Sequence, residues 1–383
     1  MGIASKGILK NLMLYVFLFG LLFVSQACKK TPSSPIPPGS SSNPTATPTA
    51  LVPTVSPTST MTRTPTNTVT LTPTITPTPT GTWYTSTPTA TFTPGPGSYW
   101  TARTLSSARQ WESVAYGNGT FVAVAFGSGM AATSPDGIAW TDRILPSTKD
   151  WLTVTYGNGV FVAIASYGTV GTTAAATSPD GINWTAQTLP STQRWCSVTY
   201  GNGLFVAISE VSTVGATSPD GVNWTACALP SAQYWKSVTY GNGLFVAVPI
   251  SSSAMAATSP DGVNWTARTL PSAQDWWSVT YGNGVFVAVA FNSAVAATSP
   301  DGVNWTARTL PSPQQWESVT YGNGVFVVVA STGGFSTLAA TSPDGITWTS
   351  QTLPNMEDWD SVAYGNGVFV AVANGYSGAA SSP

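Results

Sequence analysis

The hydrophobic and polar positions of this chain follow one pattern that recurs seven times between residues 98 and 383. The consensus copy reads W-x-S-V-x-Y-G-N-G-x-F-V-A-V, continues through a segment of variable length, and ends in A-T-S-P-D-G-x-N-W-T-A-x-x-L-P-S. The leading tryptophan recurs every 40 to 44 residues, at Trp111, Trp151, Trp195, Trp235, Trp276, Trp316 and Trp359. A period near 40 residues indicates units that bury their apolar faces against one another.

Each copy contains four short β patterns. In the copy that begins at Trp276, strands are expected at residues 278–281 and 286–289, joined by a Gly-Asn-Gly hairpin turn. A short third strand ends at Ser299, a Pro-Asp-Gly turn follows, and the fourth strand covers residues 305–310. The first two strands are apolar on both faces, as expected for a sheet packed between two others. We therefore predict an all-β fold, a seven-bladed β-propeller of four-stranded blades.

The two ends of the repeat region complement each other. The seventh copy stops at Pro383, where Asp-Gly and a fourth strand should follow, and residues 98–105 have the sequence of that missing strand. We predict that this N-terminal strand closes the last blade, which leaves no free strand edge between blades. The alternative is an open or truncated array.

The N-terminal residues predict export. Lys6 and Lys10 precede an apolar run from Leu12 to Val24, a length that suits a signal peptide and is short for a membrane span. The run ends in S-Q-A-C, which resembles a bacterial lipobox with Cys28 as the lipidated residue, although Ser25 stands where that motif usually has Leu. We expect a signal peptide at 1–27 and an exported protein, lipid-anchored through Cys28 and facing the periplasm or the cell exterior. The alternative is an ordinary secretory signal cut near Ala27.

Residues 28–97 contain the lipid-anchor site and a Thr/Pro-rich stretch that predicts a disordered stalk. From residue 31 onward the stretch has a single charged residue, Arg63, and half of the 30 prolines of the chain. Proline favours extended polyproline II, and such a composition cannot bury a core. It also resembles O-glycosylated spacers, and an unmodified linker is the alternative.

Composition excludes several functions. Only 7% of residues are charged, with a net charge of −2, so no basic surface for nucleic acid is expected. The chain has no His, which excludes Ser-His-Asp chemistry and His-ligated metal, and we expect neither a metal nor a cofactor. Cys196 and Cys227 would lie on opposite edges of one blade, too far apart for a disulfide, and are expected to be free thiols.

Six S-P-D-G-x-x-W motifs begin at Ser134, Ser178, Ser218, Ser259, Ser299 and Ser342. They resemble the Asp-box of sialidase-type (BNR) propellers, with one residue fewer than the usual S-x-D-x-G-x-x-W. The resemblance covers residues 98–383 and implies the propeller fold, with the Ser and Asp side chains closing a turn and the Trp packed beneath. It specifies activity weakly, because such propellers include glycosidases, sorting receptors and assembly factors. It implies that the Asp residues are structural, with calcium ligation as the alternative.

Length variation distinguishes the two faces of the predicted ring. All insertions fall between the second and third strands, whereas the Gly-Asn-Gly and Pro-Asp-Gly turns of the opposite face barely change. Residues flanking the leading Trp also vary from copy to copy. Aromatic residues among Ser, Gly and Asn suit adaptable recognition, although unselected drift is the alternative. Our candidate ligand-binding residues on this face are Tyr234, Trp277, Phe126, Tyr167, Phe291, Phe335, Tyr376, Glu112, Asp150, Asp275, Glu317, Asp358 and Asp360.

These features favour a monomeric binding module of the cell surface or envelope whose variable face receives a glycan or a protein. One alternative is an envelope scaffold or assembly factor, and another is a sialidase-like glycoside hydrolase. A sialidase needs a cluster of arginines that binds the substrate carboxylate, together with a Tyr nucleophile. Here Arg103, Arg143, Arg268 and Arg308 are copies at equivalent outer positions, and the Tyr is repeated sevenfold. We therefore expect no enzyme, although paired carboxylates of the variable face could in principle cleave a glycoside.

Overall fold

A computed structural model describes residues 68–76, 85–93, 95–166, 168, 170–331 and 336–383. The predicted signal peptide, Cys28 and most of the predicted stalk lie outside the described residues. Among the described residues there is no helix with the length and apolar character of a membrane span.

The described strands are, in chain order, β1 (Thr68–Thr76), β2 (Thr85–Thr93), β3 (Thr101–Gly117), β4 (Thr120–Phe126), β5 (Ser128–Ser134), β6 (Thr141–Gly157), β7 (Val160–Ser166), β8 (Thr172–Ser178), β9 (Thr185–Gln193), β10 (Trp195–Gly201), β11 (Leu204–Ser218), β12 (Thr225–Gly241), β13 (Leu244–Ile250), β14 (Ser253–Ser259), β15 (Thr266–Gln274), β16 (Trp276–Gly282), β17 (Val285–Ala290), β18 (Ser293–Ser299), β19 (Thr306–Gly322), β20 (Val325–Ser331), β21 (Ser336–Ser342), β22 (Thr349–Gly365), β23 (Val368–Asn374) and β24 (Tyr376–Ser382).

Two of these strands lie within the predicted stalk. β1 and β2 pair antiparallel and form a separate two-stranded sheet. Pro73 stands opposite Pro88, so the two residues without a backbone donor face each other across the same pair. The remaining positions of both strands are mostly Thr, a β-branched residue that favours strands.

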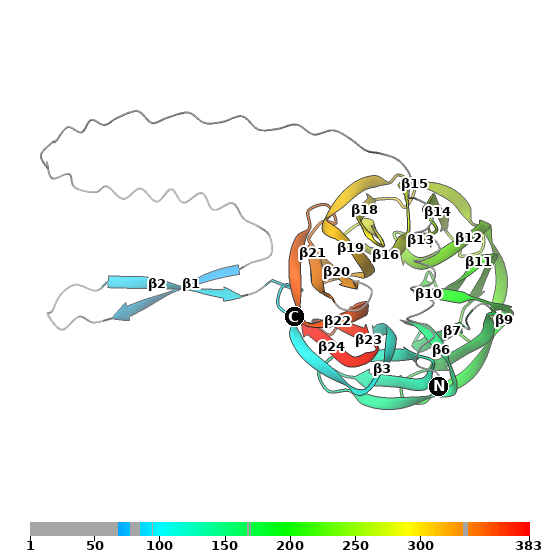
Figure 1. Ribbon diagram of the computed structural model, residues 1–383, viewed down its shortest axis with the longest axis horizontal. Coiled ribbons are helices and arrows are strands. Elements are labelled where there is room, and N and C mark those ends of the chain that lie inside the picture. Colours follow the sequence, from blue (N-terminus) through cyan, green and yellow to red (C-terminus); the bar gives the residue numbers. More distant parts are fainter. Residues whose placement is uncertain (1–67, 77–84, 94, 167, 169, 332–335) are drawn as a thin grey trace, which may run out of the picture. The chain divides into compact units, whose positions relative to one another are not determined.

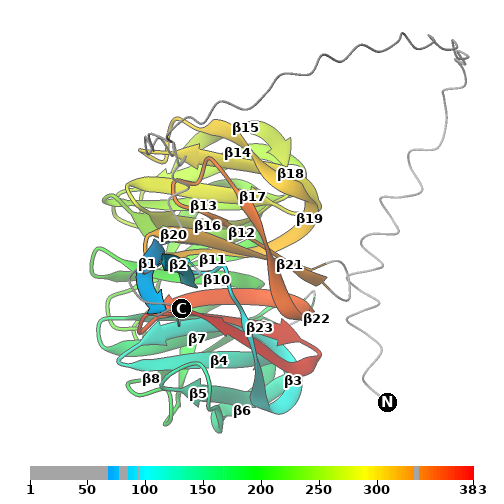
Figure 2. The same ribbon diagram turned by 90° about the vertical axis from the view of Figure 1, so that its left-hand side faces the viewer.

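The other strands form a ring of seven blades around a central opening, and they run from one face of the ring to the other (Figures 1 and 2). Each blade has four antiparallel strands, called A to D from the opening outward. In blade 5, for example, they are β16, β17, β18 and the first part of β19, whose second part is strand A of blade 6. The prediction of an all-β, seven-bladed propeller is confirmed.

The hydrophobic core consists of seven clusters, each lying between two neighbouring blades. Strand B explains this arrangement because successive residues of a strand point to opposite faces. In β13, Phe245 and Ala247 belong to one cluster, whereas Val246 and Val248 belong to the next. The leading Trp of every blade is fully buried in these clusters. Burying this apolar surface on both sides of each blade is the main stabilisation of the ring.

Contacts near the opening fix the spacing of the blades. The ring of Tyr321 lies directly on the backbone of Gly282 in the preceding blade, where a Cβ would be 2.0 Å from the tyrosine Cγ. The same contact recurs in all seven blades, so the Gly of Tyr-Gly-Asn-Gly admits no side chain. Beside it, the backbone N–H of Val319 donates a hydrogen bond of 3.1 Å to Ser278 of the preceding blade.

The last blade is closed by the N-terminal strand, as predicted. The first part of β3 pairs with β24, with Ala102 opposite Ala380 and Arg103 opposite Ala379. Closure also includes Gly97, the last residue of the predicted stalk, which donates a 3.1 Å hydrogen bond to the Pro383 carbonyl. Trp100 Nε1 donates to the Gly97 carbonyl, as Trp184 does to Gly181 in blade 2. The seventh counterpart of the Pro-Asp-Gly turn, which has no Asp, is therefore assembled from the two ends of the ring.

This closure predicts a sharp effect of N-terminal truncation. A chain that begins at residue 107 lacks the outer strand of blade 7 and loses Trp100 and Leu105 from the core, both nearly fully buried. We expect aggregation or a Tm lower by roughly 10 °C. A chain that begins at residue 95 retains the closure and should melt like the full-length protein. Equal Tm values for the two truncated chains in a thermal melt would contradict the closure.

Candidate functional site

One face of the ring is built almost identically in every blade. It carries the A–B and C–D turns, and we call it the fixed face. Asn283 of the A–B turn has a φ of 48° and donates a hydrogen bond of 3.2 Å to the Pro343 carbonyl in the next blade. The same bond recurs from Asn118, Asn158, Asn202, Asn242 and Asn366. These side chains hold neighbouring blades together, which explains why this face tolerates little change.

The six aspartates of the C–D turns also serve this face. Asp220 Oδ1 accepts hydrogen bonds from the backbone N–H groups of Val222 and Asn223 and from the Ser218 hydroxyl, at 2.8 to 3.0 Å. The pKa of all six carboxyl groups is lowered. In Asp220 the Asn223 N–H has the largest influence, and the pKa falls to about 2. Each carboxylate therefore closes its own hairpin.

The opposite face collects the residues that vary, and we call it the variable face. In five blades the residue before the leading Trp pairs with the last residue of strand B. Tyr234 pairs in this way with Ile250, Gln110 with Phe126 and Asp150 with Ser166. In blades 3 and 5 its carbonyl accepts a hydrogen bond from the N–H of Glu210 or Phe291, so in all seven blades the D–A connection lies beside the B–C loop. The prediction that insertions and sequence changes share one face agrees with these pairs.

A β-bulge follows every leading Trp, a feature that the sequence pattern did not indicate. In blade 5 the register shifts between Trp276 and Ser278, so Trp277 is the extra residue. Such bulges reorient one side chain while the strand continues. The seven bulge residues occupy equivalent places on strand A near the opening, and they are Glu112, Leu152, Cys196, Lys236, Trp277, Glu317 and Asp360. They include four of our candidates.

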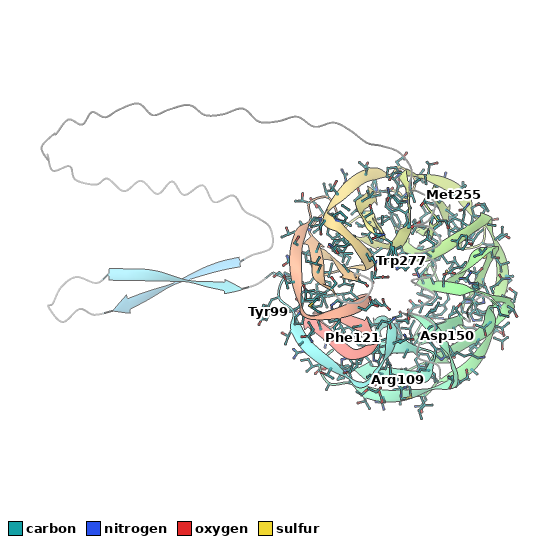
Figure 3. All side chains as sticks on the ribbon, in the orientation of Figure 1. Tyr99, Arg109, Phe121, Asp150, Met255 and Trp277 are labelled. Atoms are coloured by element: carbon teal, nitrogen blue, oxygen red, sulfur yellow. The ribbon has the colours of Figure 1, made fainter. Side chains whose placement is uncertain are left out.

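Trp277 lies beside the central opening (Figure 3), and its indole ring is contacted by one aromatic and one cationic side chain. The Phe291 ring stacks on it with centroids 4.2 Å apart and planes at 22°. The Lys236 ammonium lies 4.1 Å from the indole centroid, a cation–π contact. The cluster thus joins two neighbouring blades.

The candidate carboxylates gather where blades 6, 7 and 1 meet. Asn374 Nδ2 donates to Asp360 Oδ2 at 2.8 Å and to Glu112 Oε1 at 3.1 Å. Glu317, the bulge residue of blade 6, has only 7% of its surface exposed. Blades 4 and 5 contribute Lys236 and Trp277 at the same positions, so charge is unevenly distributed around the opening.

Other candidate acids hold neighbouring loops. Asp275 Oδ1 accepts from the backbone N–H groups of Ser251 and Ser252, at 2.8 and 2.5 Å, and these residues form the B–C loop of blade 4. The Ser331 hydroxyl donates to Asp358 in the next blade. Both carboxylates are thus engaged by the protein itself, which reduces what they offer to a ligand.

The tips of two B–C loops expose apolar side chains. Val170 in blade 2 is 72% exposed and Val211 in blade 3 is 47% exposed. Val211 has a φ of 55°, a conformation that β-branched residues rarely adopt. Tyr167 and Phe335 lie outside the described residues, and Tyr376 is described in its backbone alone, as the first residue of β24.

The arginines do not converge on one point. The Nε atoms of Arg103, Arg143, Arg268 and Arg308 each donate to a Ser or Thr hydroxyl of the adjacent strand C, at 2.8 to 2.9 Å. The repeated Tyr packs on Phe and Gly inside the ring, as Tyr281 does on Phe286.

Among residues 95–166, 168, 170–331 and 336–383, no group of three or more acidic or Cys side chains is placed to hold a metal. Cys196 and Cys227 are free, as expected, and burial raises the pKa of both thiols, to about 11 for Cys227.

With this geometry the chain belongs structurally to the β-propellers. Virginiamycin B lyase from Staphylococcus aureus matches with a TM-score of 0.65 and 12% identity, over 74% of this chain and 98% of that chain. YCF48 bound to D1 peptide matches with a TM-score of 0.57 and 16% identity, over 74% and 94%. PorZ, a surface component of the type-IX secretion system of Porphyromonas gingivalis, matches with a TM-score of 0.53 and 9% identity, over 73% of this chain and 37% of PorZ. No family model and no curated protein matches the sequence.

These similarities overturn the expectation that the chain is not an enzyme. The expectation rested on arginine and tyrosine side chains that the repeat copies around the ring, yet the same fold forms a streptogramin B lyase with a TM-score of 0.65. At 11% identity the likeness shows the fold alone, so it assigns no lyase activity. The histidine whose replacement by alanine inactivates the virginiamycin B lyase has no counterpart in this chain, which contains no histidine.

The turn aspartates predict a loss of stability in acid. A carboxyl group whose pKa is lower in the folded state stabilises it above the unfolded value near 3.9, and this stabilisation is lost as the pH falls through the folded pKa. We therefore expect Tm to fall between about pH 4 and pH 2. Asp220→Asn keeps an acceptor oxygen but loses the charge, and should lower Tm at pH 7 by on the order of 2 °C. The difference in Tm between Asp220→Asn and the wild type should narrow from pH 4 to pH 2. A difference in Tm that stays constant over this range would contradict a stabilising role of the Asp220 charge.

Proposed function

We propose that this protein is a binding propeller whose variable face receives a protein partner. The observation that carries the proposal is the difference between the two faces. On the fixed face the same inter-blade hydrogen bond recurs from six Asn side chains. On the variable face the seven bulge positions carry six different residue types, with Glu alone used twice, and the B–C loops differ in sequence from blade to blade. Loops held on a rigid scaffold are where binding residues usually occur.

The side chains of this face favour a protein over a glycan. A sugar stacks on an open aromatic face, and the Trp277 ring is already engaged by Lys236 and Phe291. Val170 and Val211 are exposed instead, in blades 2 and 3, and acidic residues are concentrated in blades 6, 7 and 1. Exposed apolar tips beside a charged sector suit a protein interface, where an apolar centre is bordered by polar groups.

An envelope scaffold or assembly factor is the second candidate, and it uses the same face. Two of the structural neighbours are, by their descriptions, a propeller bound to a peptide and a bacterial surface component of a secretion system. The sialidase-like alternative finds no support, because each strand-D arginine is bonded within its own blade wall.

The proposal also includes the location of the protein and its kinship to Asp-box propellers. The apolar run before Cys28 supports a lipid-anchored, exported chain with a Thr/Pro-rich stalk. The kinship is supported by six turns in which Ser and Asp side chains close the hairpin, as Ser218 and Asp220 do. In most of these turns the Trp Nε1 donates to the turn glycine, as Trp224 does to Gly221.

Photo-crosslinking in cells that produce the protein tests the face. A photoreactive residue is placed at Val170 or Val211 on the variable face, and in separate variants at Ile182 or Val222 on the fixed face. The four positions lie in the same two blades, and Ile182 and Val222 are each 44% exposed. We expect discrete adducts with a partner protein from the two variable-face positions only. Adducts from the fixed face alone, or equally from both faces, would show that the wrong face has been chosen.

Lipid anchoring is tested by phase partition in a detergent that separates on warming. We expect the wild-type protein in the detergent phase and Cys28→Ala in the aqueous phase, because the substitution removes the acceptor for the lipid. The prediction fails if both proteins remain in the aqueous phase.

A further inference from the structure

A hollow of about 530 Å³ lies at the junction of blades 7 and 1. Arg109 reaches it from the end of the outer strand of blade 7, and blade 1 contributes residues 127–130 and 144–148. Met130, Ile144, Leu145 and Pro146 make much of the wall apolar, and Arg109 brings the charge. It is distinct from the variable-face cluster around Trp277, which lies beside the central opening, whereas Arg109 lies away from it (Figure 3).

Arg109 differs from the residue that most blades carry at its position, and its buried Nε–H lowers the stability of the fold because it has no acceptor. Four other blades have Gln at the equivalent position, and the remaining two have Lys149 and Glu357. The four glutamines are Gln193, Gln233, Gln274 and Gln314. The Arg109 Nε is buried and has no hydrogen-bond partner within the described part of the chain. A buried donor that belongs to a charged group and remains unpaired destabilises the fold. Nothing in the ring itself explains why this blade carries the arginine.

Ile144 departs from the repeat in the same hollow. It pairs with Met130 and is 77% exposed, the largest exposure among the large apolar residues of the ring. Five other blades place a Thr at this position, as Thr188 does in blade 2. An exposed isoleucine on an outer strand gains little by burial, so it too is unexplained by folding.

We propose that this hollow binds an organic carboxylate with an apolar body. A guanidinium presents its Nε–H and one Nη–H as a side-on fork, which matches the two oxygens of a carboxylate. A bound carboxylate would give the buried Nε its missing acceptor. The apolar part of the ligand would cover Ile144 and Met130 and remove them from water. The two departures from the repeat thereby have one common explanation.

The charges around the hollow are compatible with an anionic ligand. Two carboxylates lie beside its lining. Asp142 accepts hydrogen bonds from the hydroxyls of Ser106 and Ser107. Asp150 Oδ1 lies 4.0 Å from a Cβ built on Gly127. Neither carboxylate lines the hollow itself, whereas the positive charge of Arg109 does. The inference does not depend on the proposed function of the variable face.

Calorimetric titration of the full chain with octanoate tests the proposal, with octanamide as the uncharged probe of the same length. We expect octanoate to bind saturably with a Kd of about 1 mM or tighter. Octanamide should bind at least ~10-fold more weakly, because it cannot pair its charge with the guanidinium. Absence of saturation by about 10 mM octanoate, or equal affinity for the two probes, would overturn the proposal.

Three variants use residues that other blades already carry, so each should fold. Arg109→Gln should weaken octanoate binding at least ~10-fold, and Ile144→Thr about 3-fold. Arg268→Gln is the matched control, since it removes a charge from the outer wall at a position where Gln187 and Gln351 make the same hydrogen bond. It should leave binding unchanged. Tm of Arg109→Gln should equal or exceed that of the wild type, since an unpaired donor is removed. Unchanged binding in Arg109→Gln, or equal weakening in Arg268→Gln, would contradict the inference.

Discussion

A strand that is apolar on both faces can be buried only between two other sheets, and this requirement shapes the whole ring. Strand B of every blade has this character, as Val246 and Phe245 show by contributing to different clusters. No blade is therefore stable at the edge of an open array, and the chain must return to its start. The contact of Tyr321 with Gly282 and its six equivalents then set the distance between blades.

Because the blades must pack against one another, the two faces of the ring differ in how much sequence change they tolerate. Side chains on the fixed face connect blades, so Asn283 or Asp220 cannot be exchanged without loosening a turn. On the variable face the backbone bulges supply one free choice of side chain per blade. Other residues of this face give local support, as Asp275 does by accepting hydrogen bonds from the loop of blade 4. Function can therefore evolve on one face at little cost to the fold.

The sequence predicted the blades, the turns and the closure because each depends on local chemistry that repeats. Asn-Gly turns, alternating apolar positions and a complementary terminal strand can all be read from residue order. The site was only partly predictable. A bulge such as that at Trp277 leaves no mark in a pattern of period two, and the engagement of its indole by Lys236 and Phe291 depends on contacts between residues 41 and 14 positions away. The expectation of no enzyme failed because a fold does not determine chemistry.

The seventh turn, completed by Gly97 and Pro383, has a consequence for how the ring is presented. This turn belongs to the fixed face, so the polypeptide leading into the ring joins it there, at Gly95–Gly97. If the ring is anchored through the preceding residues, as we propose, the anchor is attached to the face that has the least variation. The geometry of closure would in that case direct the loops of the variable face away from the attachment point.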